Sequence, residues 1–431
     1  MLHQVKEGND TMAHSNKPHH HYALGMHMPP RVWWNVRVDF IATLFFSLFN
    51  VVMNQFYIVF AIQQGASNLQ VGILSAAPAI GLVFSPLWAS WIEKSDNPKP
   101  FTIFPNMVGR LLLLLPAIFP DPNVYVVTAV VFQLLMGIQA PAYAALVSRI
   151  YPSNLRGRLM GYVRVGMGVL MIPLAYLVGS WTDVMGPRGP LIAAAIAGFI
   201  SVSIFNSIKV SKQGSNRNAA IREVAKVGRK QQFLEQLQLV KNNRLLAFFL
   251  IGTTLSGFGN MVSVPLYQII QVDILALSNV EIGYARVAYY VALLLTFWLG
   301  GIMIDRFDIK YTLMAGIGAY AIVPALYSLW GTYPAVLLGN AMQGVGEAIW
   351  DIGIMAFIFK IAPGREAVVF GIHLMAFGIR GSIGPILGTS LTSWLNIDVI
   401  LICASLFACL GTIIFIWGNR HEPQSRPTSS N

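Results

Sequence analysis

The segment that decides the fold occurs twice in the chain: Ser67-Asn68-Leu69-Gln70-Val71-Gly72 returns as Ser278-Asn279-Val280-Glu281-Ile282-Gly283. Each copy opens the second long apolar run of its half of the chain. Ser or Asn can cap a helix, the polar Gln or Glu side chain follows in the first turn, and Gly lets helices pack closely. A repeat of this kind indicates that one helical bundle was duplicated.

Further matches at nearly the same spacing extend the repeat across both halves. Because both copies of the bundle would start on the same side, the pseudo-two-fold axis should run along the membrane normal. This arrangement predicts a cavity where the halves meet. The matching pairs are Asn50 with Asn260, Tyr57 with Tyr267, Glu93 with Asp305, Lys94 with Arg306, and Gly137 with Gly344.

The composition excludes a soluble protein. Hydrophobic residues make up 55% of the chain and charged residues only 11%, with a mean hydropathy of +0.60. The expected fold class is an all-α polytopic membrane protein with twelve transmembrane helices in two six-helix pseudo-symmetric halves. A spanning helix needs about 20 mainly apolar residues, and twelve runs approach or exceed that length: 38–62, 69–92, 101–119, 124–149, 156–182, 189–208, 245–270, 279–303, 310–330, 334–361, 365–394 and 397–418.

The positions of Lys and Arg predict the orientation, because cytoplasmic loops are enriched in them. Loops at one end carry nearly all of these residues, whereas loops at the other end carry only Arg188. Both termini are then cytoplasmic, and we expect a monomeric, multi-pass protein in the cell membrane (plasma or inner membrane). The net charge of +11 reflects topology rather than nucleic-acid binding, since the basic residues lie between apolar runs.

The expected organisation has five parts. No cleavable signal peptide is expected, because the first 30 residues are polar and the first apolar run is too long. Cys403 and Cys409 are too few for a disulfide framework or a zinc knuckle, and we expect no metal or cofactor. The parts are a disordered cytoplasmic tail over 1–37, a six-helix bundle over 38–208, a cytoplasmic linker with an amphipathic helix over 209–244, a second six-helix bundle over 245–418, and a cytoplasmic tail over 419–431.

Three short patterns at matching places support a family resemblance. Residues Gly300 to Lys310 read Gly-Gly-Ile-Met-Ile-Asp-Arg-Phe-Asp-Ile-Lys, residues Asn340 to Gly346 read Asn-Ala-Met-Gln-Gly-Val-Gly, and residues Gly384 to Gly388 read Gly-Pro-Ile-Leu-Gly. With the twelve runs and the repeat, they resemble the major facilitator superfamily of secondary transporters. The resemblance implies alternating access by rocking of the two halves, with a small-molecule substrate and the lipid bilayer as partners.

The resemblance also implies a cytoplasmic gate. Asp305 would pair with Arg365 or cap the eleventh helix when the gate is shut. The first half departs from the family pattern, because its gate loop is reduced to Glu93-Lys94-Ser95-Asp96 and because Gln133 stands where many antiporters carry Arg. Proton antiport by the usual route is therefore not supported. The expected gate residues are Glu93, Gly301, Asp305, Arg306 and Arg365.

In the superfamily the first, fourth, seventh and tenth helices line the cavity, which implies a polar cleft with aromatic walls. Asn and Gln in membrane helices can also serve only to join neighbouring helices, and that alternative stays open for each residue. The expected cavity residues are Asn50, Asn54, Tyr57, Gln133, Gln139, Asn260, Tyr267, Asn340, Gln343 and Trp350.

Two acidic residues in the tenth run are candidates for proton coupling. Glu347 and Asp351 lie four residues apart and therefore on one face of a helix. Charges inside a bilayer are costly unless they face a cavity or a partner, so we expect one of the two carboxyl groups to carry a proton. Arg164, Arg286 and Arg380 are candidate charge partners, and a purely structural salt bridge with Arg286 or Arg380 is the competing interpretation.

The sequence predicts transport of a small organic solute by alternating access, with proton coupling through Glu347 or Asp351. Four arginines against two acids inside the spans favour an anionic or neutral polar solute. The alternatives are a multidrug efflux transporter and a membrane sensor or scaffold that moves nothing. An enzyme is not expected, because the chain has no His-Glu-x-x-His, nucleophile elbow or phosphate loop.

Overall fold

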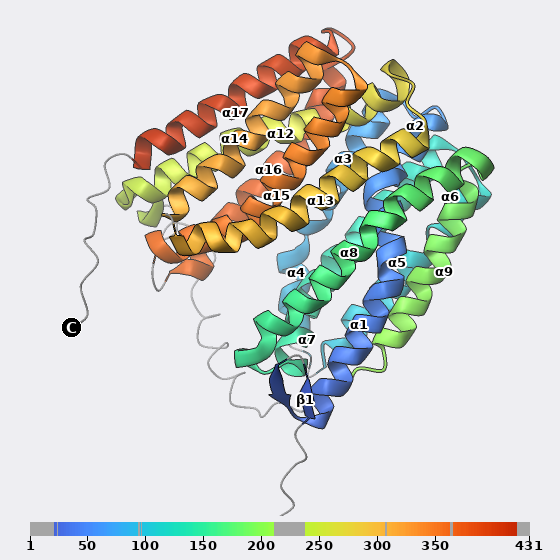
Figure 1. The fold of residues 1–431 in the computed structure, drawn as a ribbon, viewed down its shortest axis with the longest axis vertical. Coiled ribbons are helices and arrows are strands. Elements are labelled where there is room, and N and C mark those ends of the chain that lie inside the picture. Colours follow the sequence, from blue (N-terminus) through green and yellow to red (C-terminus); the bar gives the residue numbers. More distant parts are fainter. Residues whose placement is uncertain are drawn as a thin grey trace, which may run out of the picture.

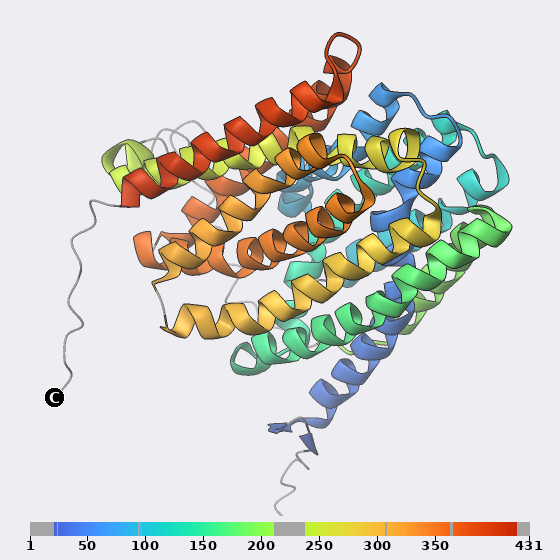
Figure 2. The ribbon, with the colours of Figure 1, turned by 45° about the horizontal axis from the view of Figure 1, so that its top comes forward.

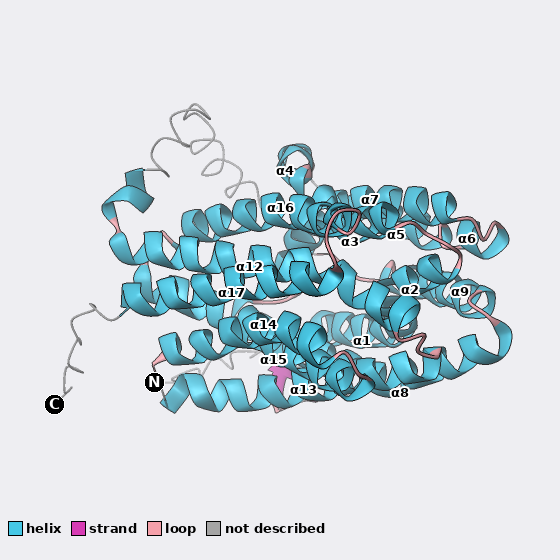
Figure 3. Ribbon diagram, turned by 90° about the horizontal axis from the view of Figure 1, so that it is seen from above, coloured by secondary structure: helices cyan, strands magenta, loops and turns pink. Residues whose placement is uncertain are grey.

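The computed structural model describes residues 21–23, 25–93, 95, 97–210, 238–306, 308–362 and 365–419. Within these residues the protein is a bundle of long helices, which Figure 3 shows from above. The helices form two halves, coloured blue to green and yellow to red in Figure 1.

The first half follows a short hairpin and contains six spans, some of them broken into shorter helices. The hairpin pairs β1 (His21–Ala23) with β2 (Met26–Met28). The helices are α1 (Pro30–Asn50), the π-helix η1 (Val51–Phe56), α2 (Tyr57–Gln63), α3 (Asn68–Val83), α4 (Ser85–Glu93), α5 (Lys99–Leu111), α6 (Leu114–Ile118), α7 (Pro122–Ile150), α8 (Ser153–Met185) and α9 (Arg188–Phe205).

The second half repeats this plan with longer continuous helices. Its first span ends in a π-helix, whereas the π-helix in the first span of the first half lies between α1 and α2, so both halves carry one in the first span. The elements are α12 (Arg244–Ile269), η2 (Ile270–Ile274), α13 (Asn279–Arg306), α14 (Ile309–Trp330), α15 (Tyr333–Ile361), α16 (Glu366–Leu391) and α17 (Ile397–Asn419).

Each of the twelve predicted apolar runs is helical. Eleven helical segments are long and apolar enough to cross a membrane by length and composition. The tenth run, α15, is not among the eleven although it has 29 residues. It carries Glu347, Asp351 and Lys360, and these charges and its other polar groups offset its apolar residues.

The prediction of a disordered tail over 1–37 is wrong for its last part. The hairpin begins at His21, and α1 begins at Pro30, where proline suits the first turn of a helix. Val32 and Val36 are buried in a cluster with Leu146, so apolar packing orders this stretch. The amphipathic helix expected in the linker lies almost wholly outside the described residues, as do residues 1–20 and 420–431.

The two halves share apolar cores at one end of the bundle only. One shared cluster joins Met171 and Ala175 of α8 to Ile282 and Tyr290 of α13, and Figure 2 shows these two helices side by side. A second shared cluster joins residues of α2 and α3 to α12 and α13. At the other end each half has a core of its own. The halves therefore meet at one end and are separate at the other.

We call the end where the halves are separate the basic end, because most of the Lys and Arg of the described helix ends and loops lie there. The N-terminal end of α1 and the C-terminal end of α17 both lie at this end. The end where the halves meet is called the closed end. Residues that mark the basic end include Arg149, Arg158, Lys310, Lys360 and Arg365.

The repeated segment caps equivalent helices at the closed end. The Ser67 hydroxyl accepts from the Gln70 N–H at 3.4 Å, and the Gln70 side chain accepts from the Ser67 N–H at 2.8 Å. In the second copy the Ser278 hydroxyl accepts from the Glu281 N–H at 3.2 Å, and the Glu281 carboxylate accepts from the Ser278 N–H at 2.8 Å. Both copies are capping boxes, which satisfy backbone donors at the starts of α3 and α13.

The Asn of each copy reaches across to the other half. The Asn68 amide donates to the Thr392 hydroxyl at 2.7 Å. Asn279 accepts from the Gln63 amide at 3.0 Å and donates to the Asp183 carboxylate at 2.8 Å. These five side chains, Gln63, Asn68, Asp183, Asn279 and Thr392, are the closed-end latch.

Asp183 is the charged member of the latch. Besides the Asn279 side chain, its carboxylate accepts the backbone N–H groups of Asn279 at 2.8 Å and of Val280 at 2.9 Å. A carboxylate from the first half thus caps a helix of the second half, where the helix dipole favours negative charge.

The Gly of each copy also lies at the contact between the halves. A side chain at Gly72 would collide with Thr389 and approach the Pro385 carbonyl, and one at Gly283 would meet the Ala175 carbonyl at 2.9 Å. Gly179 on α8 is equally tight, because a side chain there would collide with the backbone of Asn279. Close backbone approach of this kind needs small residues.

We expect Asp183→Ala to open the closed end. The substitution removes three hydrogen bonds to a carboxylate, each shared between the halves, and loss of one such bond costs about 2 kcal/mol, or roughly a 30-fold shift in an equilibrium. The readout is the rate at which a maleimide reacts with a cysteine that replaces Ile62, a residue only 5% exposed at this contact. The native cysteines are removed by Cys403→Ser and Cys409→Ser. The reaction should be faster in the Asp183→Ala variant than in the parent protein.

The matched control is Asp121→Ala. Asp121 also caps a helix, through the Asn123 N–H at 2.8 Å, but both residues belong to the first half. This variant should leave the reactivity at position 62 unchanged. Equal rates in the Asp183 variant and in the parent protein would show that the latch does not hold the halves together.

Candidate functional site

A cavity of about 1100 Å³ lies between the halves. Its walls come from α1, η1, α3, α5, α7, α8 and α9 of the first half and from α13 and α15 of the second. The lining reaches toward the basic end at Asp39, Gly157 and Met160, where the two halves have separate cores. At the closed end the latch and the shared cores seal it. Within the described residues, the cavity therefore opens toward the basic end.

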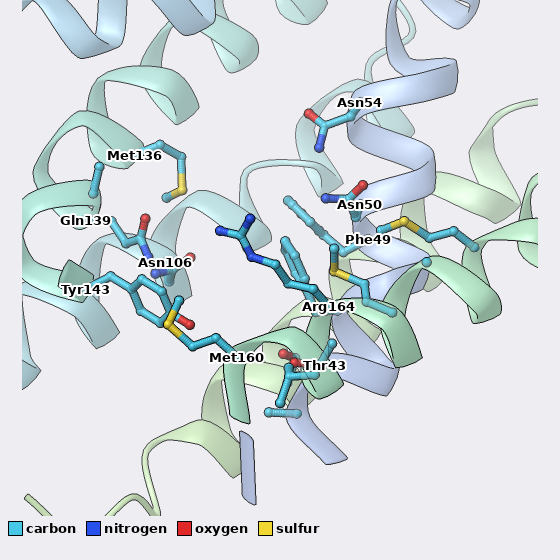
Figure 4. A pocket seen from close by; sticks show the side chains of 18 of the residues that line it. Thr43, Phe49, Asn50, Asn54, Asn106, Met136, Gln139, Tyr143, Met160 and Arg164 are labelled. Carbon is cyan, nitrogen blue, oxygen red and sulfur yellow. The ribbon is translucent and has the colours of Figure 1, made fainter. Parts of the chain in front are cut away.

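Side-chain amides line the cavity from two helices of the first half. Asn50, Asn54 and Gln55 come from the junction of α1 with η1, and Gln133 and Gln139 come from α7. Figure 4 shows Asn50 and Asn54 on one side of the pocket and Gln139 on the other. A π-helical turn changes the face on which side chains emerge, and such turns are frequent at functional sites.

Three charged side chains in the cavity wall are accessible within it. Arg164 of α8 reaches into the pocket between α7 and α1, as Figure 4 shows. Glu347 and Asp351 line the opposite wall from α15. The Glu347 carboxylate accepts from the Tyr289 hydroxyl of α13 at 2.6 Å. An electrostatic attraction links Asp351 to Arg164.

Two further charged groups of the lining are held by neighbours in the first half. The Asp39 carboxylate accepts from the Tyr151 hydroxyl at 2.7 Å. Arg110 donates to the Gly198 carbonyl at 3.1 Å and to the Asn106 side chain at 3.2 Å, and its guanidinium lies 4.6 Å from the centre of the Phe46 ring.

The expected cavity residues include none from the third span, which forms part of this wall. Asn106 and Arg110 of α5 both line the cavity. They are four residues apart, which puts them on one helix face. This spacing of polar residues in an apolar run could have predicted that one face of the third span lines the cavity. The aromatic side chains Tyr289, Tyr290 and Phe297 of α13 complete the wall of the second half.

The cavity lining does not include the other expected cavity residues. Tyr57 is buried and donates to the Tyr125 carbonyl at 2.9 Å, while Tyr267 is buried against the Tyr327 ring. The seventh span, α12, packs inside the second half, so its Asn260 and Tyr267 face helices rather than the cavity. The expected residues outside the lining are Tyr57, Asn260, Tyr267, Asn340, Gln343 and Trp350.

The pairing of Glu347 or Asp351 with Arg286 is corrected by the structure. Arg286 is 4% exposed. It donates to Asn340 at 2.6 Å, to Gln268 at 2.7 Å and to Gln271 at 3.3 Å. Amide oxygens of neighbouring helices accept from its two terminal nitrogens, while its Nε is buried without a hydrogen-bond partner among the described residues. Its hydrogen bonds therefore go to these amides and not to Glu347 or Asp351.

Arg380 is likewise occupied elsewhere. It is 3% exposed, donates to the Thr253 carbonyl at 2.7 Å and lies 5.2 Å from the centre of the Trp350 ring. Neither Arg286 nor Arg380 lines the cavity. The excess of arginines inferred from the sequence therefore does not describe the cavity, where two arginines face three acids, counting Asp39.

The expected cytoplasmic gate can be located only in part. Glu93 ends α4, and Gly301, Asp305 and Arg306 lie in the last turns of α13, but their side chains fall outside the described part of the structure. Arg365 is exposed immediately before α16. The pairing of Asp305 with Arg365 remains a prediction.

Comparison with known proteins identifies relatives of low sequence identity. The Tetracenomycin C resistance and export protein of Streptomyces glaucescens is 25% identical over 159 residues, which are 36% of this chain and 29% of that protein. The uncharacterized MFS-type transporter YqjV of Bacillus subtilis (strain 168) is 21% identical over 182 residues, which are 42% of this chain and 44% of that protein. The chain thus matches less than half the length of each of these two curated relatives.

Solved structures show the same fold over nearly the whole chain. The crystal structure of the nucleoside transporter NupG superposes with a TM-score of 0.68 at 14% identity, and the match covers 90% of this chain and 100% of that one. The sequence profile of the Major Facilitator Superfamily matches residues 39–273 and 249–431. Together with the spans and the duplicated halves, the profile match means that this multi-pass, all-α membrane protein belongs to the Major Facilitator Superfamily.

Proposed function

We propose that the protein moves a small organic solute across the cell membrane by alternating access. The observation that carries the proposal is a cavity between two pseudo-symmetric halves that is sealed at the closed end by the latch and is accessible from the basic end. The family supports this function, as do relatives named as an export protein and a nucleoside transporter.

Alternating access requires that the two ends exchange roles. In the proposed cycle the cavity faces the cytoplasm in the present conformation, because the basic end is expected to be cytoplasmic. Breaking the latch and closing the basic end would expose the same cavity to the other side. The shared apolar cores at the closed end and the hydrogen bonds of the latch must then separate together.

Proton coupling through Glu347 or Asp351 is the second part of the proposal. Both carboxyl groups line the cavity and lie one helical turn apart, so two full negative charges there would repel each other at short range. Tyr289, Tyr290 and Tyr320 lie close to Glu347, and Arg164 faces Asp351. Proton uptake by one carboxyl would relieve the repulsion as the solute binds or leaves.

Export of an aromatic compound is a second candidate. The cavity is large enough for a drug-sized molecule, and rings from Phe49, Phe132, Tyr143, Tyr290 and Phe297 line it. The Tetracenomycin C export protein is a relative over part of its length. Flux of candidate solutes in reconstituted vesicles decides direction, and absence of any flux would favour the sensor or scaffold alternative.

We expect Glu347→Gln and Asp351→Asn to separate coupling from transport. Ligands are first chosen by thermal shift against sugars, nucleosides, amino acids, organic acids and drugs. In vesicles, the variant of the coupling residue should lose accumulation driven by a pH gradient but keep solute exchange, since exchange needs no net proton release. Asp398→Asn, at an exposed position outside the cavity, is the matched control. If both cavity variants accumulate solute as the parent does, coupling through these acids is wrong.

The proposed orientation predicts from which side of the membrane each introduced cysteine can be labelled. In a background with Cys403→Ser and Cys409→Ser, a cysteine at Met160 in the cavity wall should react with a membrane-impermeant maleimide added from the cytoplasmic side only. A cysteine at Trp394, which is 86% exposed at the closed end, should react from the outside only. The reverse pattern would refute the assignment of the basic end to the cytoplasm.

A further inference from the structure

Two opposite charges face each other across the cavity from different halves. Arg164 belongs to α8 of the first half and Asp351 to α15 of the second, and both are exposed within the cavity that they line. In the part of the chain that the structure describes, neither side chain forms a hydrogen bond or an ion pair. The two side chains therefore attract each other only across the cavity, and each can bind a group of opposite charge that enters the space between them.

The two charges lie at similar depth in the bundle. Arg164 is three turns from the start of α8 at Ser153, roughly 16 Å at 1.5 Å per residue, and Asp351 is nearly three turns from the end of α15 at Ile361, roughly 15 Å. Both helix ends are at the basic end. A molecule lying across the cavity at this level would touch both groups.

The other charged groups of the described lining are already engaged. Asp39 is bound by Tyr151, Arg110 by Gly198 and Asn106, and Glu347 by Tyr289. Glu347 is one turn deeper than Asp351 on the same helix, and its hydrogen bond keeps it at the wall. Arg164 and Asp351 are therefore the charges left to pair with a solute.

We propose that the cavity takes zwitterionic solutes, with the anionic group on Arg164 and the cationic group on Asp351. A solute with only an anionic group would leave the Asp351 charge unpaired once the cavity closes, and a solute with only a cationic group would leave Arg164 unpaired. An unpaired charge in a closed, poorly hydrated site is costly, so a molecule that carries both charges is favoured over either. The uncharged part of the solute would lie against the rings of Tyr290 and Phe297.

This inference rests on the proposed function, and it assigns separate roles to the two acids. Asp351 contacts the solute, whereas Glu347 with Tyr289 is left for the proton. Because Arg164 and Asp351 belong to different halves, a zwitterion bound to both would draw the halves together at the basic end. Closure would then depend on both charged groups of the solute.

The test uses phenylalanine and the dipeptide alanyl-phenylalanine with their singly charged derivatives. The N-acetylated forms keep only the anionic group, and the carboxamide forms keep only the cationic group. Calorimetry and thermal shift on the purified full chain should show a zwitterion binding at least about tenfold more tightly than both of its derivatives, as expected when one charge-assisted contact is lost.

Variants identify which charge binds which group. Arg164→Gln should weaken binding of the zwitterion about tenfold without weakening the carboxamide form, and Asp351→Asn should weaken the zwitterion without weakening the N-acetylated form. Each substitution removes the charge that the singly charged derivative leaves unpaired, so binding of that derivative should stay the same or become tighter. Arg164→Lys keeps the charge and should retain most of the affinity. Arg158→Gln, an exposed position on the same helix outside the cavity, and Asp398→Asn are the matched controls.

The inference is overturned if neither zwitterion binds more tightly than its derivatives, or if the Arg164 and Asp351 variants behave as the controls do. Its failure differs from failure of the proposed function. If vesicles take up a neutral or singly charged solute, and neither the Arg164 variant nor the Asp351 variant changes that uptake, the zwitterion proposal is wrong and the proposed transport function stands. Tight zwitterion binding without any flux in vesicles would support this site and refute transport.

Discussion

Contact between the two halves at one end of the bundle gives the cavity its shape. That contact depends on backbone approach at Gly72, Gly179 and Gly283 and on one carboxylate, Asp183, which binds the free backbone N–H groups at the start of α13. Helix starts have unsatisfied donors that must find partners, and here a residue from the other half supplies the partner. The same interaction therefore completes a helix and closes one end of the cavity.

Two groups of charged residues inside the bundle have different consequences. Arg286 and Arg380 lie within the second half, where carbonyl and amide oxygens and an aromatic ring surround them. Such groups are costly to bury, and their hydrogen bonds to several helices bind those helices to one another. Arg164, Glu347 and Asp351 instead face the cavity. A solute that enters the cavity can replace the water next to these side chains. Only the second group can respond to a ligand or a proton.

The sequence was sufficient for the fold because its signals are local. Apolar runs and the capping residues at Ser67 and Ser278 depend on neighbours within a few turns, and each copy of the repeat is itself a short stretch that can be recognised in the sequence. The candidate site was only partly predictable, since the face that a helix presents depends on packing. Asn50 and Gln139 line the cavity, whereas Tyr267 and Asn340, expected there by resemblance, join helices instead. The role of Asp183 could not be predicted, because its partner lies nearly a hundred residues along the chain.

The central claim is that the ends of the bundle open and close in opposition, and a pair of distances measured by double electron–electron resonance in lipid nanodiscs tests it most directly. One pair of labels replaces Arg158 and Phe359 at the basic end, and the other replaces Val184 and Trp394 at the closed end; all four positions are exposed. Compared with the parent protein, Asp183→Ala should add a shorter distance at the basic end together with a longer one at the closed end. Distances that stay the same in both pairs, or that lengthen in both, would contradict the account.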